Sequence, residues 1–414
     1  MEPSRNAGAL SEWRQHGKVV LAAVAGMSIS TLPSYSAALL YTPFEQEFGW
    51  ARAQVAAPHI IASIAAIVFS PFVGALIDRH GPRRIGIAAA VLMCLFVPLI
   101  SLVGPKLWTL SAFYLAMSLP TVLIQPMVWT SAITSQFSSG RGFALAVTLC
   151  GSGIGSILIP PLTFELISTF GWRTGFILLG AIWGAGTIPL VILFFRGARD
   201  AADAPPLASH HPSLRAILSG EVLTRRFLQL VLAGFCFAIV AVPAITQMVP
   251  ILGGNGLSLR QAAYVASFAG FASITGRLTI GLLLDRLPGR LIAVGCLALP
   301  VIGALILIQN PGSVPAATVA VLVFGLALGA ELDIMAYLTS RYCPVRNFGM
   351  LFGIIGGAIG IAGSTGPIAL NAVYDATGSY HPALWGMIPL CLVAALLFLL
   401  LGPYPDAHDR MEHT

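Results

Sequence analysis

The sequence has few charged residues and almost no lysine. Asp, Glu, Lys and Arg make up 9% of its 414 residues, and only two of the 22 basic residues are lysines. A typical soluble domain carries roughly 25% charged residues, whereas here 57% of the residues are hydrophobic. No soluble packing could hide so much apolar surface from water, and the same composition excludes a disordered chain. We therefore predict an all-α membrane protein with many spans.

Patterns typical of enzymes and cofactor sites are also missing. The sequence contains no HExxH, GxSxG or GxxxxGK[ST] motif, which excludes the common signatures of metalloproteases, serine hydrolases and P-loop nucleotide sites. Its six cysteines lie in or beside apolar segments without CxxC spacing, as expected of buried apolar residues. The net charge of +6 is not gathered into a basic stripe, so nucleic acid is not an expected partner. We expect no enzyme activity, no metal and no cofactor.

Long apolar segments are what the chain has instead. A helix that crosses the hydrocarbon core needs about 20 mostly apolar residues. Twelve such segments lie between charged or Pro/Gly-rich breaks: 19–42, 53–77, 85–103, 107–134, 143–168, 174–195, 227–250, 261–284, 291–309, 315–339, 350–374 and 383–402. We predict twelve transmembrane helices.

The basic residues between these segments are unequally distributed. If the N-terminus is cytoplasmic, 17 Lys and Arg residues fall on the cytoplasmic side, four fall on the other side, and Arg277 lies inside a span. Cytoplasmic loops carry the excess of basic residues in membrane proteins, so we predict that both termini are cytoplasmic, in the inner membrane of a bacterium. The charged segment before the first span indicates an anchor and not a cleaved signal peptide.

A shift of 207 residues aligns the sequence on itself. The matched pairs are Pro43 and Pro250, Gly74 and Gly281, Asp78 and Asp285, Arg79 and Arg286, Arg83 and Arg290, Gly153 and Gly360, Pro160 and Pro367, and Gly171 and Gly378. Six spans in each half give both halves the same direction across the membrane, which indicates a parallel repeat. We predict two six-helix halves, 1–195 and 227–414, joined by a cytoplasmic linker at 196–226.

One repeated motif resembles a known family signature. Residues 74–84, GALIDRHGPRR, resemble the loop signature after the second span in the major facilitator superfamily, and residues 281–290 resemble its degenerate second copy. The resemblance implies the major facilitator fold and a gating role for Gly74, Asp78, Arg79, Arg83, Gly281, Asp285, Arg286 and Arg290. Glycines at such positions allow close approach of neighbouring helices, and the aspartates could pair with arginines of the facing half. The alternative is a pair of solvated turns.

Other segments resemble bacterial relatives of the monocarboxylate transporters and oxalate/formate antiporters: Phe48–Val55, Arg141–Ala144, Gly171–Arg173, Gly276-Arg277 and Gly349–Gly363. In those relatives an arginine of the eighth helix binds the substrate carboxylate and a tyrosine of the tenth helix donates to it. The resemblance assigns these roles to Arg277 and Tyr337.

The chain departs from those relatives in three places. Its first span contains no lysine, Ser273 stands where the eukaryotic carriers have an aspartate, and residues 350–374 contain no basic residue. A single buried cation favours one carboxylate, because a dianion would leave a charge unpaired in a low-dielectric site.

Arg277 is also notable for its depth. It lies eight residues before Asp285, and therefore roughly 12 Å inside the cytoplasmic end of its helix. A charged side chain at that depth is costly unless it faces a polar cavity or a partner, and the planar guanidinium suits bidentate binding of a carboxylate. The alternative is a permanent ion pair with Glu331 or Asp333 in span ten.

Span ten places two acids on different faces. Asp333 and Tyr337 are four residues apart and share a face, whereas Glu331 lies about 200° from Asp333. We predict that one acid carries a proton, and we favour Asp333. The alternative for the other acid is a helix-packing hydrogen bond.

Weaker candidates complete the predicted site. His59 is a further candidate for proton coupling, and Tyr114, Trp129 and Ser273 are candidates for substrate binding. Each of these side chains is at least as compatible with a role in helix packing as with proton coupling or substrate binding.

These observations predict a monomeric secondary active transporter of organic monocarboxylates, which works by alternating access and is coupled to protons as a symporter. Its partners would be a small organic anion, protons and the lipid bilayer. The main alternative is a proton-coupled exporter of drugs or neutral metabolites, in which Arg277 belongs to a structural ion pair. A sensor on a transporter scaffold is disfavoured, since no long soluble segment is present.

Overall fold

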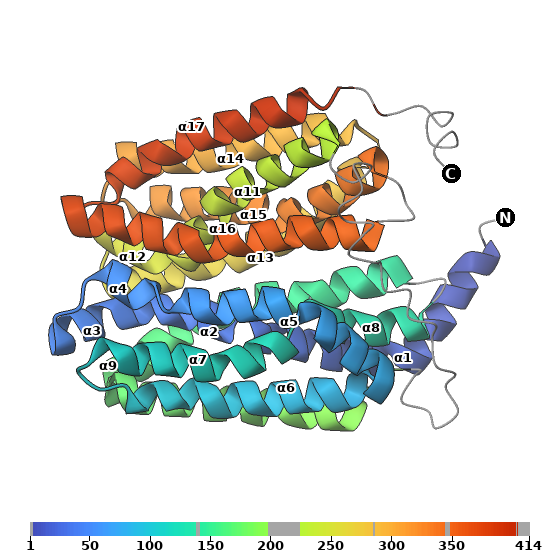
Figure 1. Ribbon diagram of the computed structural model, residues 1–414, viewed down its shortest axis with the longest axis horizontal. Coiled ribbons are helices and arrows are strands. Elements are labelled where there is room, and N and C mark those ends of the chain that lie inside the picture. Colours follow the sequence, from blue (N-terminus) through green and yellow to red (C-terminus); the bar gives the residue numbers. More distant parts are fainter. Residues whose placement is uncertain are drawn as a thin grey trace. The chain divides into compact units, whose positions relative to one another are not determined.

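The computed structural model describes residues 3–137, 141–197, 224–284, 286–343, 348–402 and 404, without the side chains of 3–10, 67, 70, 71, 74, 75, 78 and 348–350. These residues form helices joined by turns, with no strand among them, and in each half the long helices run side by side (Figure 1). The chain divides into two compact units between residues 208 and 209. The predicted linker at 196–226 lies almost entirely outside the described residues.

Unit 1 contains the first eleven helical elements. They are α1 (Pro3–Ser30), α2 (Leu32–Ala37), the 3₁₀ helix η1 (Ala38–Leu40), α3 (Tyr41–Phe48), α4 (Arg52–Ala56), α5 (His59–His80), α6 (Pro82–Phe96), the 3₁₀ helix η2 (Val97–Leu102), α7 (Leu107–Leu123), α8 (Pro126–Gln136) and α9 (Arg141–Phe194). Helix α9 is two helices that meet at Gly171, whose backbone is not helical (φ 76°, ψ 162°).

Unit 2 contains α11 (Arg225–Thr246), α12 (Met248–Gly254), α13 (Leu259–Leu284), α14 (Gly289–Gln309), α15 (Val314–Tyr342), α16 (Phe348–Thr377) and α17 (His381–Leu399). We call the end of each unit at which α5 turns into α6, or α13 into α14, its basic end, because Arg79, Arg83, Arg286 and Arg290 lie there.

The number of spans agrees with the sequence. Ten helical segments are long and apolar enough to cross a membrane, and one of them, α9, consists of two helices that each count as a span. The 22-residue helix α5 is a further apolar segment of spanning length. The described part of the chain therefore contains the twelve predicted spans, and the predicted all-α membrane fold is confirmed.

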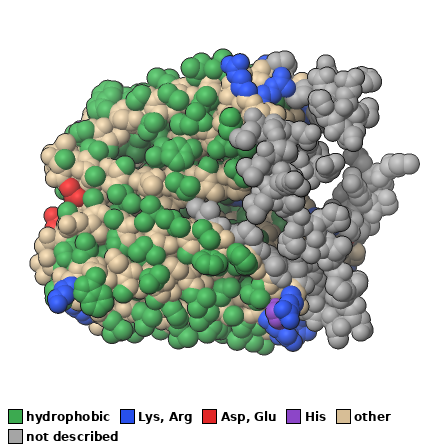
Figure 2. Space-filling model, in the orientation of Figure 1, with side chains coloured by type: hydrophobic (Ala, Val, Ile, Leu, Met, Phe, Trp, Pro, Cys, Tyr) green, Lys and Arg blue, Asp and Glu red, His purple; other side chains and the backbone are tan. Residues whose placement is uncertain are grey.

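Apolar side chains cover the flanks of the helices. Leu102, Leu282 and Phe72 are among the most exposed, at 77%, 68% and 67%. Figure 2 shows hydrophobic side chains spread over the visible helix flanks, with coloured basic side chains near the helix ends. Such a surface is unfavourable in water and suits a lipid environment, so the chain is a multi-pass membrane protein.

The internal repeat is visible in local structure. The Ala51 amide donates to Oε1 of Gln54 at 3.1 Å, and 207 residues later the Ser258 amide donates to Oε1 of Gln261 at the same distance. In each half this hydrogen bond caps the first turn of the helix that follows, α4 or α13. The two halves thus begin corresponding helices with the same capping hydrogen bond.

Candidate functional site

Helices α13 and α15 approach each other closely because small residues line their interface. A Cβ atom built at Gly276 of α13 would lie 2.5 Å from the carbonyl oxygen of Leu326, and one at Gly329 of α15 would meet the carbonyl oxygen of Ser273. Small residues at such crossings let two membrane helices pack backbone to backbone. This close packing brings Arg277, next to Gly276, within reach of α15.

We predict that Gly276→Ala lowers the free energy of unfolding by about 1–3 kcal/mol, because the added methyl group must push α13 away from Leu326. Gly281→Ala on the same helix is the matched control, since nothing lies within 4 Å of a Cβ built there. Thermal unfolding of the two purified variants measures the difference. Equal melting temperatures would contradict the packing argument.

Arg277 and Asp333 form an ion pair inside unit 2. The guanidinium Nη1 lies 3.5 Å from Oδ1 of Asp333, and the two side chains are 12% and 27% exposed. Arg277 lies seven residues before the end of α13, which is about 10 Å from that end. A charge-assisted hydrogen bond is usually 2.7–2.9 Å long, so this contact leaves room for a closer acceptor. The predicted alternative partner, Asp333, is thus the one that the structure brings to Arg277.

Glu331 lies on another face of α15. Four residues further along, Met335 packs against α11, where a Cβ at Gly234 would lie 2.9 Å from its Cε. Residues four apart share a helix face, so Glu331 is directed toward α11 while Asp333 is directed toward α13. Glu331 is 2% exposed, and its Oε1 has no hydrogen-bond partner among the described residues. The two acids of span ten therefore have different environments.

Tyr337 lies one turn beyond Asp333 and contacts the start of α14. A Cβ at Gly289 would lie 2.8 Å from the Cδ1 atom of its ring. The hydroxyl of Tyr404, in the segment after α17, accepts a hydrogen bond from the Gly289 amide at 2.7 Å, so both tyrosines contact the start of α14. Arg277 thus has an ionic partner within unit 2, and Tyr337 packs at the start of α14. Ser273, half-buried on α13, contributes its carbonyl group to the helix contact with Gly329.

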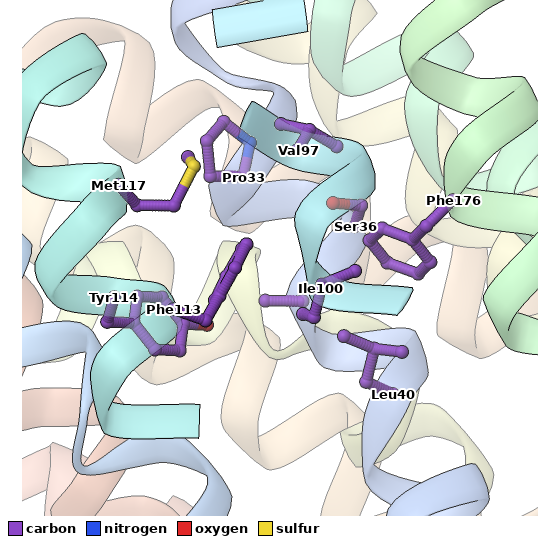
Figure 3. A pocket seen from close by; sticks show the side chains of 10 residues that line it. Pro33, Ser36, Leu40, Val97, Ile100, Phe113, Tyr114, Met117 and Phe176 are labelled. Carbon is purple, nitrogen blue, oxygen red and sulfur yellow. The ribbon is translucent and has the colours of Figure 1, made fainter. Parts of the chain in front are cut away.

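His59 and Tyr114 lie together in unit 1. Their rings are 5.3 Å apart in an edge-to-face arrangement. Tyr114 borders a small, mostly apolar pocket between α2, η1, η2, α7 and Phe176 of α9 (Figure 3). Ser36 and Tyr114 are the lining residues that carry a polar group in their side chains. The structure therefore joins two of the weaker candidates, on the unit that does not contain Arg277.

Trp129 is a packing residue, and the prediction that it contacts substrate is wrong. Its side chain is fully buried, with its ring against Gly26 and 4.8 Å from the ring of Phe195. Its indole nitrogen lies 3.4 Å from the carbonyl oxygen of Ile124. No part of the ring remains for a ligand, because the neighbouring helices of unit 1 enclose it.

The loop signatures are only partly described. The side chains of Gly74 and Asp78, and residue Asp285, lie outside the described residues. In unit 1 the Arg83 guanidinium donates to the carbonyl oxygen of Ile192 at 2.9 Å, near the end of α9. This bond suits the partial negative charge at a helix C-terminus.

The remaining signature residues lie at the basic ends. Arg79 and Arg286 are exposed, and Arg290 is half-buried. Gly281 is exposed and nothing lies within 4 Å of a Cβ built there, so it does not provide the predicted close helix contact. Other glycines of unit 2, among them Gly276 and Gly329, do make close helix contacts.

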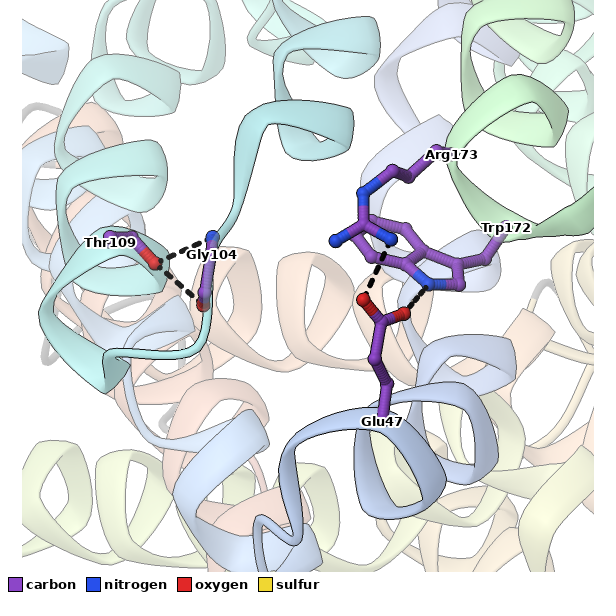
Figure 4. A network of polar contacts seen from close by, with 5 residues as sticks. All are labelled: Glu47, Gly104, Thr109, Trp172 and Arg173. Atoms are coloured by element: carbon purple, nitrogen blue, oxygen red, sulfur yellow. Dashed lines mark hydrogen bonds and ion pairs between the residues drawn. The ribbon is translucent and has the colours of Figure 1, made fainter.

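A polar cluster at the other end of unit 1 was missed by the sequence analysis. Glu47 of α3 accepts a hydrogen bond from the Trp172 indole at 2.7 Å and pairs with Arg173 at 2.7 Å (Figure 4). The Arg173 guanidinium also lies 4.2 Å from the Trp172 ring. These contacts tie the end of the first span to the turn at Gly171. The sequence signal that could have revealed this cluster is that residues 48–55, next to Glu47, and residues 171–173 both resemble relatives of the monocarboxylate transporters. The fold brings these two segments together.

Comparisons with known proteins agree with this architecture. Residues 19–346 match the family model described as Major Facilitator Superfamily. Monocarboxylate transporter 12 of Rattus norvegicus is 23% identical over 411 residues, covering 91% of this chain and 82% of that protein. The probable sulfoacetate transporter SauU of Cupriavidus necator is 25% identical over 355 residues, covering 80% of each. The crystal structure of nucleoside transporter NupG matches with a TM-score of 0.76 at 12% identity, covering 93% of this chain and all of that chain. At that identity the last likeness concerns the fold alone.

Proposed function

The chain belongs to the Major Facilitator Superfamily, and from that premise we propose that it moves organic monocarboxylates across the cytoplasmic membrane together with protons. Its two six-helix halves, 1–195 and 227–414, would open the substrate site first to one side of the membrane and then to the other. Residues 196–226 would be the linker. The basic ends would face the cytoplasm of a bacterium, as the distribution of Lys and Arg suggests.

The observation that carries this proposal is Arg277, a guanidinium within a membrane span whose partner is a side-chain carboxylate. Asp333 offers the same chemical group as the proposed substrate, at a distance of 3.5 Å that a better-placed carboxylate could improve. A substrate anion would take the place of Asp333 on Arg277. Two of the relatives are named for carboxylic acids, as monocarboxylate transporter 12 and as a probable sulfoacetate transporter, which supports a substrate with a carboxylate.

Proton coupling follows from this exchange of partners. When Asp333 binds a proton it loses its charge and releases Arg277, which can then hold the substrate anion. Substrate anion plus proton adds no net charge to the membrane interior, which limits the cost of crossing. The eukaryotic carriers have an aspartate in span eight at the position of Ser273. In this chain Asp333 of span ten would supply the acid instead. Glu331, whose Oε1 has no hydrogen-bond partner among the described residues, and His59 are secondary candidates.

A second candidate function uses the same ion pair differently. If Arg277 and Asp333 remain paired throughout the cycle, the cation is not available to an anion, and a neutral substrate is more suitable. The chain would then be a proton-coupled exporter of drugs or neutral metabolites. The ion pair itself favours this candidate, and ligand binding separates it from the first.

We expect a thermal-shift screen with short and aromatic carboxylic acids, each paired with its uncharged amide, to identify a stabilising acid. A ligand at a hundred times its dissociation constant stabilises the folded state by about 2.7 kcal/mol. The shift should be absent for the amide and for Arg277→Gln, and retained in Arg225→Gln, an exposed arginine at the start of α11. If neutral compounds shift the wild type and acids do not, the exporter is the correct reading.

A further inference from the structure

Three arginines meet around one tyrosine at the basic end of unit 2. The Arg341 guanidinium, in the last turn of α15, lies 4.6 Å from the centre of the Tyr404 ring. The Tyr404 hydroxyl accepts a hydrogen bond from the Gly289 amide at 2.7 Å. Arg290 follows Gly289 in the first turn of α14, and Arg286 precedes it by three residues. One tyrosine side chain therefore connects the cation of α15 to the two arginines that flank Gly289.

The positive charge of these arginines is not balanced within the part of the chain that the structure describes. Arg286 and Arg341 are exposed and Arg290 is half-buried. None of the three forms an ion pair with a described Asp or Glu. In unit 1 the residue that matches Arg290 in the repeat, Arg83, donates instead to the carbonyl oxygen of Ile192. The cluster of unit 2 thus presents its charge outward, where an anionic partner could bind.

Exposed leucines lie beside the same arginines. Leu287 and Leu291 each directly follow one of them in the chain and are 51% and 52% exposed. Leu400, four residues before Tyr404, is 54% exposed. They lie where α13, α14 and α17 reach the ends of their membrane-crossing segments. A soluble anion would gain nothing from exposed leucines, whereas a phospholipid carries acyl chains directly below its charged phosphate.

We call these seven residues the basic–apolar patch: Arg286, Leu287, Arg290, Leu291, Arg341, Leu400 and Tyr404. We propose that the patch binds an anionic phospholipid, with the arginines at the headgroup phosphate and the leucines against the acyl chains. Basic residues at the apolar end of a membrane helix are a common pattern for anionic lipids. Guanidinium groups suit phosphate because two of their N–H groups can donate to it in parallel.

This inference goes beyond the proposed function and does not depend on it. The patch lies at the surface of unit 2, on the residues before and after α14 and at the ends of α15 and α17. Its members do not include Arg277 or Asp333. A lipid bound there would hold the turn between α13 and α14 to the ends of two other helices, and would stabilise unit 2.

Phosphatidylglycerol is expected to bind the wild type at least tenfold more tightly than phosphatidylcholine, because the two lipids differ in net charge. The probes are the dioctanoyl lipids, added to full-length protein in a nonionic detergent, and native mass spectrometry gives the dissociation constants. Each basic residue near an anionic membrane surface contributes a factor of about five in affinity. The triple variant Arg286→Gln, Arg290→Gln, Arg341→Gln should therefore bind phosphatidylglycerol about a hundredfold more weakly. Equal binding of the two lipids by the wild type would overturn the proposal.

A second triple variant separates the patch from net charge. Arg14→Gln, Lys18→Gln, Arg225→Gln removes three exposed cations that lie outside the patch. Its affinity for phosphatidylglycerol should change by less than about threefold, and a loss equal to that of the first triple variant would overturn the proposal. Adding glycerol 3-phosphate, which has the phosphate but no acyl chains, distinguishes a lipid from a soluble anion. Displacement of phosphatidylglycerol by an equal concentration of glycerol 3-phosphate would overturn the assignment to lipid.

Single substitutions keep the test decisive if the first triple variant does not fold. Arg341→Gln, at an exposed position, should weaken phosphatidylglycerol binding about fivefold, and Leu291→Asn should weaken it while leaving every charge in place. Unchanged affinity in both variants would overturn the proposal. Arg277→Gln should bind the lipid as the wild type does, so a failure of the proposed function is distinguishable from a failure of the patch.

Discussion

Arg277→Gln is expected to lower proton-driven uptake of the carboxylic acid into proteoliposomes by about a hundredfold or more. The variant leaves the substrate anion without a counter-charge inside the membrane, and removing one partner of a buried charged pair costs roughly 2–5 kcal/mol. About 2.8 kcal/mol corresponds to a hundredfold in affinity. Arg277→Lys should recover part of the loss, because it keeps the charge but not the planar fork.

The double variant Arg277→Gln with Asp333→Asn separates binding from folding. The single arginine variant leaves Asp333 unpaired, so part of its defect comes from instability. Removing both charges should restore the melting temperature and leave uptake low. Uptake near the wild-type rate in the double variant would show that Arg277 is not a substrate ligand, and would favour the exporter.

Asp333→Asn is expected to abolish accumulation against a gradient while exchange of substrate across the membrane continues. Asparagine is neutral at every pH, so Arg277 is permanently available to the substrate. Wild-type binding should tighten as the pH falls through the titration of Asp333, because protonation releases Arg277. The variant should bind with one affinity across that range. Counterflow and proton-driven uptake, measured on the same proteoliposomes, distinguish exchange from accumulation.

Glu331→Gln is the matched control for this prediction. It makes the same chemical change two residues away, on the face of α15 that is directed toward α11. Coupled uptake should survive in this variant if Asp333 carries the proton. Loss of accumulation in Glu331→Gln and its retention in Asp333→Asn would reverse the assignment of the two acids.

The sequence was sufficient for the fold because the membrane imposes a simple length rule on each helix. Twelve apolar segments and a repeat offset of 207 residues predicted the spans that the described chain contains. Helix periodicity also separated Glu331 from Asp333 correctly, since the angle between two residues of one helix depends only on their spacing.

Periodicity did not say which helix lies opposite each face. The contact between Arg277 and Asp333 requires α13 and α15 to pack through Gly276 and Gly329, whereas the repeated loop motif predicts close packing at Gly281. The predicted contact of Trp129 with substrate was not supported for a similar reason. An aromatic residue in a span is equally compatible with a cavity and with a core, until its neighbours are known.

Sequence alone therefore determined that this chain contains twelve segments long and apolar enough to cross a membrane, that its two halves are similar in sequence, and that one arginine lies well inside such a segment. Tertiary structure decided that Asp333, and not Glu331, is the partner of Arg277. It also decided that the Tyr404 hydroxyl accepts a hydrogen bond from the amide of Gly289, 115 positions away in the chain. Composition and spacing report on single helices, whereas these contacts depend on how helices distant in the chain pack against one another.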